Sequence, residues 1–180
     1  NYQIFPKLES KRPMLEVRNT TQHDLSWIEQ IYMTAHDYMI KTGNPNQWAP
    51  GFPFTQTILD DINRQISYVI TEKGESHGVF ALIEGADPTY EHIDGKWLND
   101  QPYATIHRIA SDGKVKGIFE AAVNFAKSKY ENIRIDTYKD NKIMQHLITK
   151  NGFQYCGTIN IVPDVAGQDT SRLAYQWKKD

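Results

Sequence analysis

The sequence predicts a mixed α/β fold of the α+β kind, in which helices flank a mostly antiparallel sheet of six to seven strands. Two patterns lead to this prediction. Apolar residues recur at helical spacing in several segments, and short apolar or alternating segments of strand length lie between them. The clearest alternation of strand and helix runs from Tyr103 to Phe153. Because no repeat, low-complexity tract or linker interrupts the pattern, we expect one domain over residues 14–180.

The chain is expected to open with an arm, a strand and two helices. Residues 1–13 are polar and lack periodicity, so we interpret them as an arm, native or partly vector-derived, that need not be ordered. An alternating strand follows at 14–18, and a helix begins near Asp24 and ends before Gly43. A second helix is expected over 56–64, with Thr55 as its N-cap. These elements form the first part of the predicted domain.

The middle of the chain predicts a pair of strands between two aromatic loops. The strands are expected at 67–71 and 77–83. The loops at 44–54 and 88–100 are irregular and contain the candidate substrate-binding residues. Those candidates are Trp48, Trp97 and, just after the second loop, Tyr103. These aromatic side chains either line an acceptor pocket or pack over the end of the sheet.

The second half of the chain alternates strands and helices regularly. Asp140 is the expected N-cap of the last helix, and Gly152 is placed to end it. The expected strands are 104–110, 132–137, 153–161 and 172–177, and the expected helices are 115–129 and 141–150. A mixed sheet with antiparallel flanking hairpins accounts for this order.

Bulk properties exclude several classes of protein. The net charge of −2 argues against a general nucleic-acid binder, which would carry a basic excess. No apolar run approaches the length of about 20 residues that spans a bilayer, and the first residues of the sequence lack the basic, apolar and small-residue pattern from which a secretory signal would be expected. The lone Cys156 excludes an internal disulfide, and the scattered histidines lack zinc spacing. We therefore expect a cytoplasmic protein with no metal, no nucleic-acid partner and no membrane association.

An anion-binding device lies after the strand at 104–110. A turn at Ser111–Gly113 leads into Lys114-Val-Lys-Gly117, which opens a helix. The first N–H groups of a helix lack intrahelical partners, and the helix dipole places partial positive charge there. Lys114 and Lys116 are either phosphate ligands or part of a solvated face. Their place beside Gly117 favours phosphate binding, so we expect a phosphorylated cofactor.

Two blocks of sequence resemble a known superfamily. Ile106-His-Arg-Ile-Ala, followed by Lys114-Val-Lys-Gly-Ile, resembles the acyl-CoA-binding motif of the GNAT superfamily of N-acyltransferases. The later block resembles that superfamily's second conserved half. It comprises Ile133-Arg-Ile-Asp-Thr, Asp140-Asn141, Met144-Gln145 and Asn151-Gly-Phe153. The resemblance covers about residues 14–177, and it implies that the strands at 105–110 and 133–137 splay apart at the centre of the sheet.

The resemblance also implies a co-substrate and a reaction. Acetyl-CoA would supply an acetyl group to a primary amine, most simply of a small molecule, by direct transfer in a ternary complex. Its pyrophosphate would lie on the loop and helix N-terminus, its pantetheine arm would pair with the preceding strand, and an asparagine would contact it. The implied cofactor-binding residues are Ile109, Ala110, Lys114, Val115, Lys116, Gly117, Ile118 and Asn141.

Two positions depart from the family pattern and leave alternatives open. Phe119 stands where a small residue normally allows close approach, and Ile148 stands where many members have a tyrosine acid. These departures motivate a catalytically silent acyl-CoA-binding or interaction module as the alternative function. A nucleotide-binding domain is a third possibility, but the chain contains neither GxxxxGK[ST] nor GxGxxG.

Three residues are candidates for catalysis. His107 is the candidate base because histidine is the side chain best suited to accept a proton near neutral pH, Tyr138 is the candidate acid, and Asp136 can orient an amine or a histidine. Each also has a structural interpretation. The histidine and the tyrosine can be hydrogen-bonded packing residues, and the aspartate can pair with Arg108 or Arg134.

Three weaker signals complete the sequence interpretation. Cys156 near His146 or His107 can suggest a thiol nucleophile, but a free cysteine in a strand is usually a small buried residue. Arg172 can meet a substrate carboxylate. Exposed sheet edges can pair between subunits, so a homodimer is expected as a possibility that nothing in the sequence requires.

Overall fold

An eight-stranded sheet organises the protein in a computed structural model that describes residues 14–180. The expected N-terminal arm, residues 1–13, lies outside the described residues. The strand order is β1-β2-β3-β5-β6-β8-β7-β4, and every neighbouring pair is antiparallel except β5 and β6. The mixed, mostly antiparallel sheet is confirmed. It has more strands than the six to seven expected, one of them the two-residue β4.

The elements follow the expected order with small shifts at their ends. The strands are β1 (Leu15–Asn19), β2 (Ser67–Glu72), β3 (Glu75–Glu84), β4 (Asp94–Gly95), β5 (Ala104–Ser111), β6 (Asn132–Thr137), β7 (Gln154–Asn160) and β8 (Ser171–Lys178). The helices are α1 (Leu25–Lys41), α2 (Thr55–Asn63), α3 (Ile118–Lys129) and α4 (Lys142–Lys150), with short 3-10 turns η1 (Gln22–Asp24) and η2 (Pro88–Tyr90).

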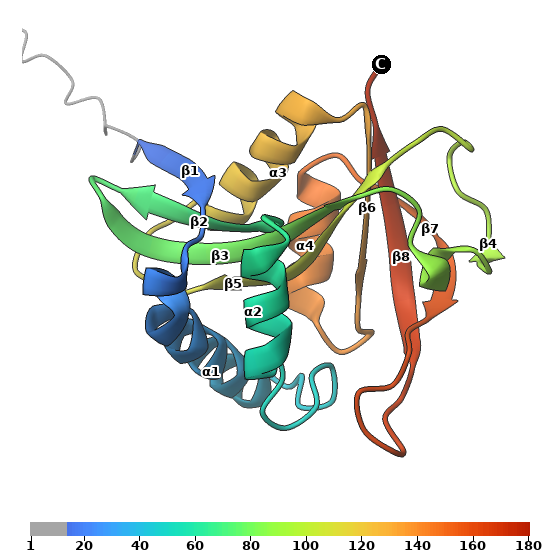
Figure 1. Cartoon of the computed structure of the whole chain (residues 1–180). Helices are drawn as coiled ribbons and strands as arrows, with labels where there is room; N and C mark the ends of the chain where they lie inside the picture. Colours follow the sequence, from blue (N-terminus) through green and yellow to red (C-terminus); the bar gives the residue numbers. More distant parts are fainter. Residues whose placement is uncertain (1–13) are drawn as a thin grey trace, which may run out of the picture.

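Helices cover both faces of the sheet (Figure 1). Residues 28, 31 and 32 of α1 pack with α2 against one face, which includes Val79 of β3 and Ala110 of β5. Helix α3 and Ile148 of α4 pack on the opposite face, beside Phe80 and Ile106. Successive strand residues point to opposite faces, so the centre of β3 is a continuous apolar run because both of its faces are buried.

Two helix caps differ from those expected. Thr55 is the first residue of α2 and not its N-cap, since its Oγ1 donates to Glu29 Oε1 at 3.0 Å. Asn141, not Asp140, caps α4, because its Oδ1 accepts a hydrogen bond from Met144 N at 3.0 Å. Both expected caps were wrong by one position. At α4, the neighbouring Asp140 and Asn141 have similar capping propensities, and tertiary contacts decide between them.

The sheet divides between β5 and β6. These parallel strands pair only at Ala104↔Ile133 and Thr105↔Arg134, although β5 continues to Ser111. Beyond Thr105 the edge of β5 that faces β6 therefore pairs with no strand among residues 14–180, and the expected splay of the central strands is confirmed. Figure 1 shows the two halves of the sheet on either side of α4. Within residues 14–180, no helix has the length and apolar character needed to cross a membrane.

Candidate active site

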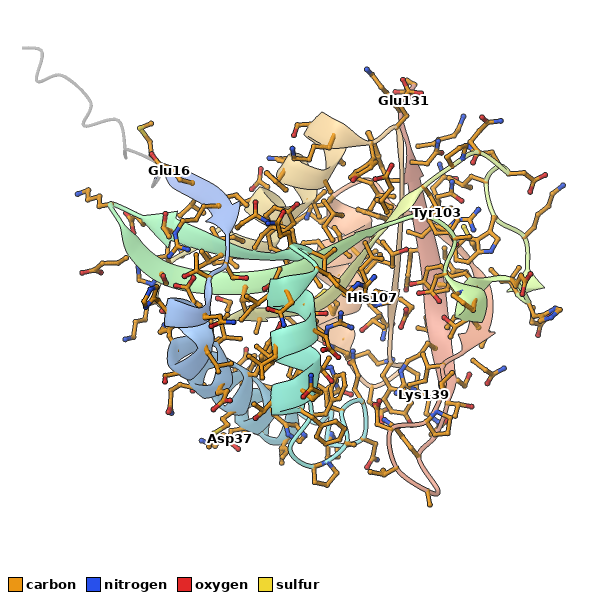
Figure 2. All side chains as sticks on the ribbon, in the orientation of Figure 1. Glu16, Asp37, Tyr103, His107, Glu131 and Lys139 are labelled. Atoms are coloured by element: carbon orange, nitrogen blue, oxygen red, sulfur yellow. The ribbon has the colours of Figure 1, made fainter. Side chains whose placement is uncertain are left out.

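A cavity of about 280 Å³ opens where β5 and β6 separate. Residues 106–109 of β5 and 135–136 of β6 form its two sides, and the loop before α2 contributes Trp48 and Phe52. The polar lining consists of Gln47, Asp87, Thr89, His107, Arg108, Asp136, Asn141, Asp164 and Arg172. Figure 2 shows His107 near the middle of the molecule, between the two halves of the sheet. The split thus brings charged groups from distant segments to one cavity.

A bulge in β5 shapes one side of the cavity. The register with β3 shifts between Val79 and Ala81, and Arg108 within the bulge has a φ of 50°, in the left-handed region. Its guanidinium forms a bidentate ion pair with the buried Asp61, at 2.7 and 2.8 Å. Tyr32 donates its hydroxyl to the Arg108 carbonyl at 2.6 Å. These contacts hold a backbone conformation that costs a non-glycine residue free energy.

His107 and Asp87 form a hydrogen-bonded pair in the cavity wall. His107 Nε2 lies 3.1 Å from Asp87 Oδ2, and the backbone N–H and hydroxyl of Thr89 donate to Asp87 Oδ1 at 2.9 and 2.7 Å. Burial disfavours the carboxylate, but the hydrogen bonds from His107 and Thr89 outweigh it and lower the pKa of Asp87 to about 2. Asp87 is therefore ionised at neutral pH and can orient the imidazole.

Asp136 is the second carboxylate at the separated strands. The buried Tyr90 donates its hydroxyl to Asp136 Oδ2 at 2.6 Å. Burial and then the charge of Asp136 raise the pKa of Tyr90 well above its usual range, so this phenol remains a donor. The Tyr90 ring lies 6.3 Å from the His107 ring. Tyr90 thus lies between the two carboxylate sites: its hydroxyl binds Asp136, and its ring lies close to the imidazole that Asp87 holds.

Neither arginine that was expected to pair with Asp136 does so. Arg108 pairs with Asp61, as described above. The Arg134 guanidinium carbon lies 4.0 Å from the ring centre of Trp97 and 3.9 Å from that of Tyr103. Trp97 and Tyr103 therefore stack around Arg134 and are not among the residues that line the cavity, whereas Trp48 is. Of the three candidate substrate-binding aromatics, the structure brings only Trp48 to the cavity.

Tyr138 also lies outside the cavity lining. Its hydroxyl donates to Asp169 Oδ2 at 2.8 Å, and this hydrogen bond is the main cause of its raised pKa. Its side chain is buried and faces Arg172, whose guanidinium carbon lies 4.7 Å from the tyrosine ring centre. Cys156 is buried and forms no hydrogen bond to a histidine among residues 14–180. In the same part of the chain, no cluster of three His, Cys, Asp or Glu side chains forms a metal site.

The loop between β5 and α3 leads directly into the N-terminus of α3. Gly117 has a φ of 88° and is the N-cap of α3, so the helix starts at Ile118, three residues later than expected. The Ala121 N–H makes the first intrahelical bond, to Gly117 O, which leaves the preceding N–H groups free. Lys114 and Lys116 are exposed.

Phe119 does not obstruct this loop. Its side chain is only 6% exposed, and it packs in the core with Val123 and other residues of the sheet face under α3. The bulky residue that departs from the family pattern is therefore accommodated by the core. Ile148, the second departure, is fully buried in the same core and leaves the tyrosine position without a proton donor.

A hydrogen-bonded pair secures the start of the loop. Asp112 Oδ2 lies 2.8 Å from His77 Nδ1, its Oδ1 accepts from the Lys114 N–H at 2.9 Å, and its own N–H donates to His77 O at 3.0 Å. His77 is 8% exposed and lies on β3. The first residues of the loop are thus bound to the sheet through one aspartate.

Sequence reasoning missed the partners of the site residues. Asp87, Thr89 and Tyr90 lie on the long connection after β3, and Gln47 lies on the loop before α2. One signal was available, since Asp-Pro-Thr at 87–89 is a typical start of a helical turn, and Asp87 does cap η2. Gln47 had no comparable signal. Its Oε1 accepts hydrogen bonds from Asn44 and Asn141, at 2.8 and 2.9 Å.

Comparison with known proteins identifies the family. No protein-family model matches the sequence, and no curated protein matches it. Among solved structures, a GNAT-family acetyltransferase from Streptococcus agalactiae is 32% identical over 92% of this chain and 96% of its own, with a TM-score of 0.81. A GNAT-family acetyltransferase from Listeria monocytogenes is 16% identical over 91% and 94% of the two chains, with a TM-score of 0.65.

A third similar structure is a spermidine N-acetyltransferase from Vibrio cholerae in complex with CoA and spermine. It is 16% identical over 92% of this chain and 95% of its own, with a TM-score of 0.59. At this identity the likeness concerns the fold alone. The first comparison, together with the split sheet, is decisive. This chain belongs to the GNAT family and is an acyl-CoA-dependent acetyltransferase.

Proposed function

We propose that this protein transfers the acetyl group of acetyl-CoA to the primary amine of a small molecule, within a ternary complex. One observation carries the proposal: the hydrogen-bonded pair of His107 and Asp87 lines the cavity between the separated strands. Amine acetylation requires a neutral amine, and an imidazole held by an ionised carboxylate is suited to accept its proton. Metal chemistry has no part in this proposal.

Three features of the chain fit acetyl-CoA as the acetyl donor. The exposed loop with Lys114, Val115 and Lys116, which ends at Gly117 and Ile118, fits the pyrophosphate. The unpaired edge of β5 around Ile109 and Ala110 offers backbone groups to the pantetheine arm. Asn141 lines the cavity but is already engaged. Its Oδ1 caps α4 and its Nδ2 donates to Gln47, so one amide N–H is left for a ligand.

The charges of the site define the roles of its residues. The ionised Asp87 accepts from His107 Nε2, so Nε2 carries the proton and Nδ1 keeps the lone pair that accepts the proton of the amine. Asp136, held by Tyr90, orients the amine beside it. A backbone N–H on the free edge of β5 can donate to the thioester oxygen as negative charge develops there. Tyr138 has no role in this scheme because its hydroxyl is directed to Asp169.

A catalytically silent acyl-CoA-binding module is the competing function. The buried Ile148 favours it, because a proton donor is missing where many members place a tyrosine. Binding of acetyl-CoA without turnover of any amine would support this alternative. The His107–Asp87 pair favours the enzyme, since a module that only binds needs no general base.

The test is acetyl transfer measured by thiol release from acetyl-CoA across a panel of primary amines. We expect turnover with the wild-type protein and a loss of about 10²-fold in kcat for His107→Asn, with little change in the KM for acetyl-CoA. The Asn variant keeps a polar side chain of similar reach, and thermal melting checks that it folds as the wild type does. Equal activity of the two proteins would contradict the role of His107.

A further inference from the structure

Two opposite charges in the cavity face the same side of the sheet without pairing. Asp136 of β6 lies opposite Ala174 of β8, so Arg172, two residues earlier on β8, is its diagonal neighbour on the same face. Both side chains line the cavity. No ion pair within 4.0 Å joins them in the described part of the chain, residues 14–180.

Arg172 is a buried cation whose hydrogen-bond acceptors are all neutral backbone carbonyls, although the carboxylates of Asp136, Asp169 and Asp164 lie near enough to interact with its charge. It is 2% exposed, and its Nη1 donates to the carbonyls of Asp169 and Ser171, at 2.7 and 2.8 Å. Its Nη2 donates to Gln47 O at 3.0 Å. Three of the five guanidinium N–H groups are used in this way, which leaves Nε–H and one Nη2–H without a partner among residues 14–180. These two groups suit a carboxylate, which is the usual partner of a buried guanidinium.

Asp136 offers the complementary half of the site. Its Oδ2 accepts the Tyr90 hydroxyl, and no hydrogen bond within residues 14–180 uses its Oδ1. The adjacent His107 is the proposed proton acceptor. An ammonium group beside Asp136 therefore lies where its proton can be removed before the amine attacks.

We propose that the acceptor is a zwitterion of the amino acid class, whose amine lies beside Asp136 and whose carboxylate binds Arg172. The inference rests on the proposed function, of which it names the substrate class. Diagonal neighbours on a sheet lie about 7–8 Å apart between Cα atoms, a span that their side chains bridge to a single small molecule. A polyamine would place positive charge against Arg172, and a simple anion would meet Asp136, so each of these classes is disfavoured.

The test compares matched acceptors with the wild-type protein. The first series consists of phenylalanine, its methyl ester and phenethylamine, which share one side chain but carry a free carboxylate, an esterified carboxylate and no carboxylate. The second series consists of lysine and cadaverine, which differ in the same way by the presence and absence of the carboxylate. We expect kcat/KM to be at least about tenfold higher for the amino acid than for its ester or its decarboxylated amine in one or both series. Ester or amine accepted as well as the amino acid in both series would overturn the inference. No transfer to any acceptor despite acetyl-CoA binding would instead refute the proposed function.

Two variants separate recognition from structure. Arg172→Gln should reduce the ratio of kcat/KM between amino acid and amine to near one, and Arg172→Lys should restore part of it by keeping the charge. The ratio is the informative quantity, because Arg172 also holds two loops, and a structural defect would lower both rates together. If Arg172→Gln does not fold, the wild-type comparison of acid and ester still decides the question. An unchanged ratio in a folded variant would overturn the role of Arg172.

Discussion

Asp87 determines both the orientation of His107 and part of the stability of the site. Its carboxylate receives hydrogen bonds from His107 and Thr89 that lower its pKa to about 2. A group with a depressed pKa stabilises the fold above its ordinary pKa of about 4, and the contribution disappears as the pH falls through the folded-state value. The relevant window for this protein is therefore pH 4 to pH 2.

Asp87→Asn should lower the free energy of unfolding by about 2 kcal/mol at pH 7, because a shift of nearly two pKa units corresponds to that amount. The difference from wild type should shrink between pH 4 and pH 2. Urea unfolding at pH 7, 4 and 3 measures it. Asp37→Asn on α1 is a suitable control, since Asp37 is exposed. A difference that stays constant from pH 7 to pH 3 would contradict the role given to the carboxylate charge.

Tyr138→Phe should leave kcat within about threefold of wild type and cost about 1 kcal/mol of stability, the usual contribution of one hydrogen bond. The reason is that its hydroxyl donates to Asp169 and does not line the cavity. Steady-state kinetics and urea unfolding of the same preparation measure both effects. A loss of 10²-fold or more in kcat with normal stability would establish Tyr138 as a catalytic acid.

Single residues also mark the limit of sequence reasoning. The positions of His107 and Asp136 at the cavity were predictable because each lies in a strand that the sequence predicts, one on either side of the expected split. Asp87 and Tyr90 were missed, since their positions depend on the path of a long connection that has no periodicity. Trp97 and Tyr103 were expected at a pocket, but their stacking on Arg134 depends on that same path.

At the level of elements, the loop between β5 and α3 is organised by Asp112. This side chain joins His77 of β3 to the backbone N–H of Lys114. The loop follows the strand that lines the cavity and precedes the free N–H groups of α3. We therefore expect its conformation to affect the phosphate end of the proposed cofactor site more than the reacting end.

Asp112→Ala should weaken acetyl-CoA binding by about 5- to 10-fold, the effect expected from losing an ordered loop contact of 1–1.4 kcal/mol. Binding of S-acetyl-pantetheine, which lacks the pyrophosphate, should be unchanged. Calorimetry with both ligands tests this expectation. Glu75→Ala is the control, because Glu75 is exposed and lies 3.8 Å from His77 Nε2. Equal weakening of both ligands would show that Asp112 does not act through the phosphate site.

Element boundaries were predictable where hydrophobic periodicity ends sharply. Strand β6 agrees with its expected range of 132–137 because apolar residues alternate up to a polar turn. Helix α3 begins later than expected, since the residues before Gly117 have helical propensity but form the loop. The cap of α4 was also displaced by one residue, because Asn141 gains a contact with the distant Gln47 that local sequence does not encode.

For the whole molecule, the notable feature is a sheet in two halves. Only two residue pairs join β5 to β6, so packing of α4 and the loops holds much of the junction. A ligand that occupies the split contacts both halves. Its binding free energy is then added directly to the stability of the fold.

Saturating acetyl-CoA should raise the melting temperature by about 5–10 °C, since a ligand at 100 times its Kd adds about 2.7 kcal/mol to the stability of a protein of this size. CoA should act similarly, and ATP and NAD should not. Differential scanning fluorimetry measures the shifts. A Lys114→Ala/Gly117→Asp variant should lose most of the effect through loss of charge and loop geometry. A shift with ATP equal to that with acetyl-CoA would contradict the cofactor assignment.

The class of fold and its split were predictable because the second half of the chain carries both family-like blocks in order. Whether an edge strand of the sheet pairs with a second subunit was not predictable. The outer strands are β1 and β4, and homodimerisation through either remains a prediction, as does the cytoplasmic location. Light scattering tests the first of these. Local sequence does not specify how two exposed edges meet.

A crystal structure of this protein with CoA is the most direct test of the central claim, that the split between β5 and β6 is where the thioester meets the amine. We predict the pantetheine arm along residues 106–110, the pyrophosphate at Lys114–Ile118, and the sulfur in the cavity near His107 and Asp136. CoA bound outside the split, or with its sulfur directed away from His107, would contradict the claim.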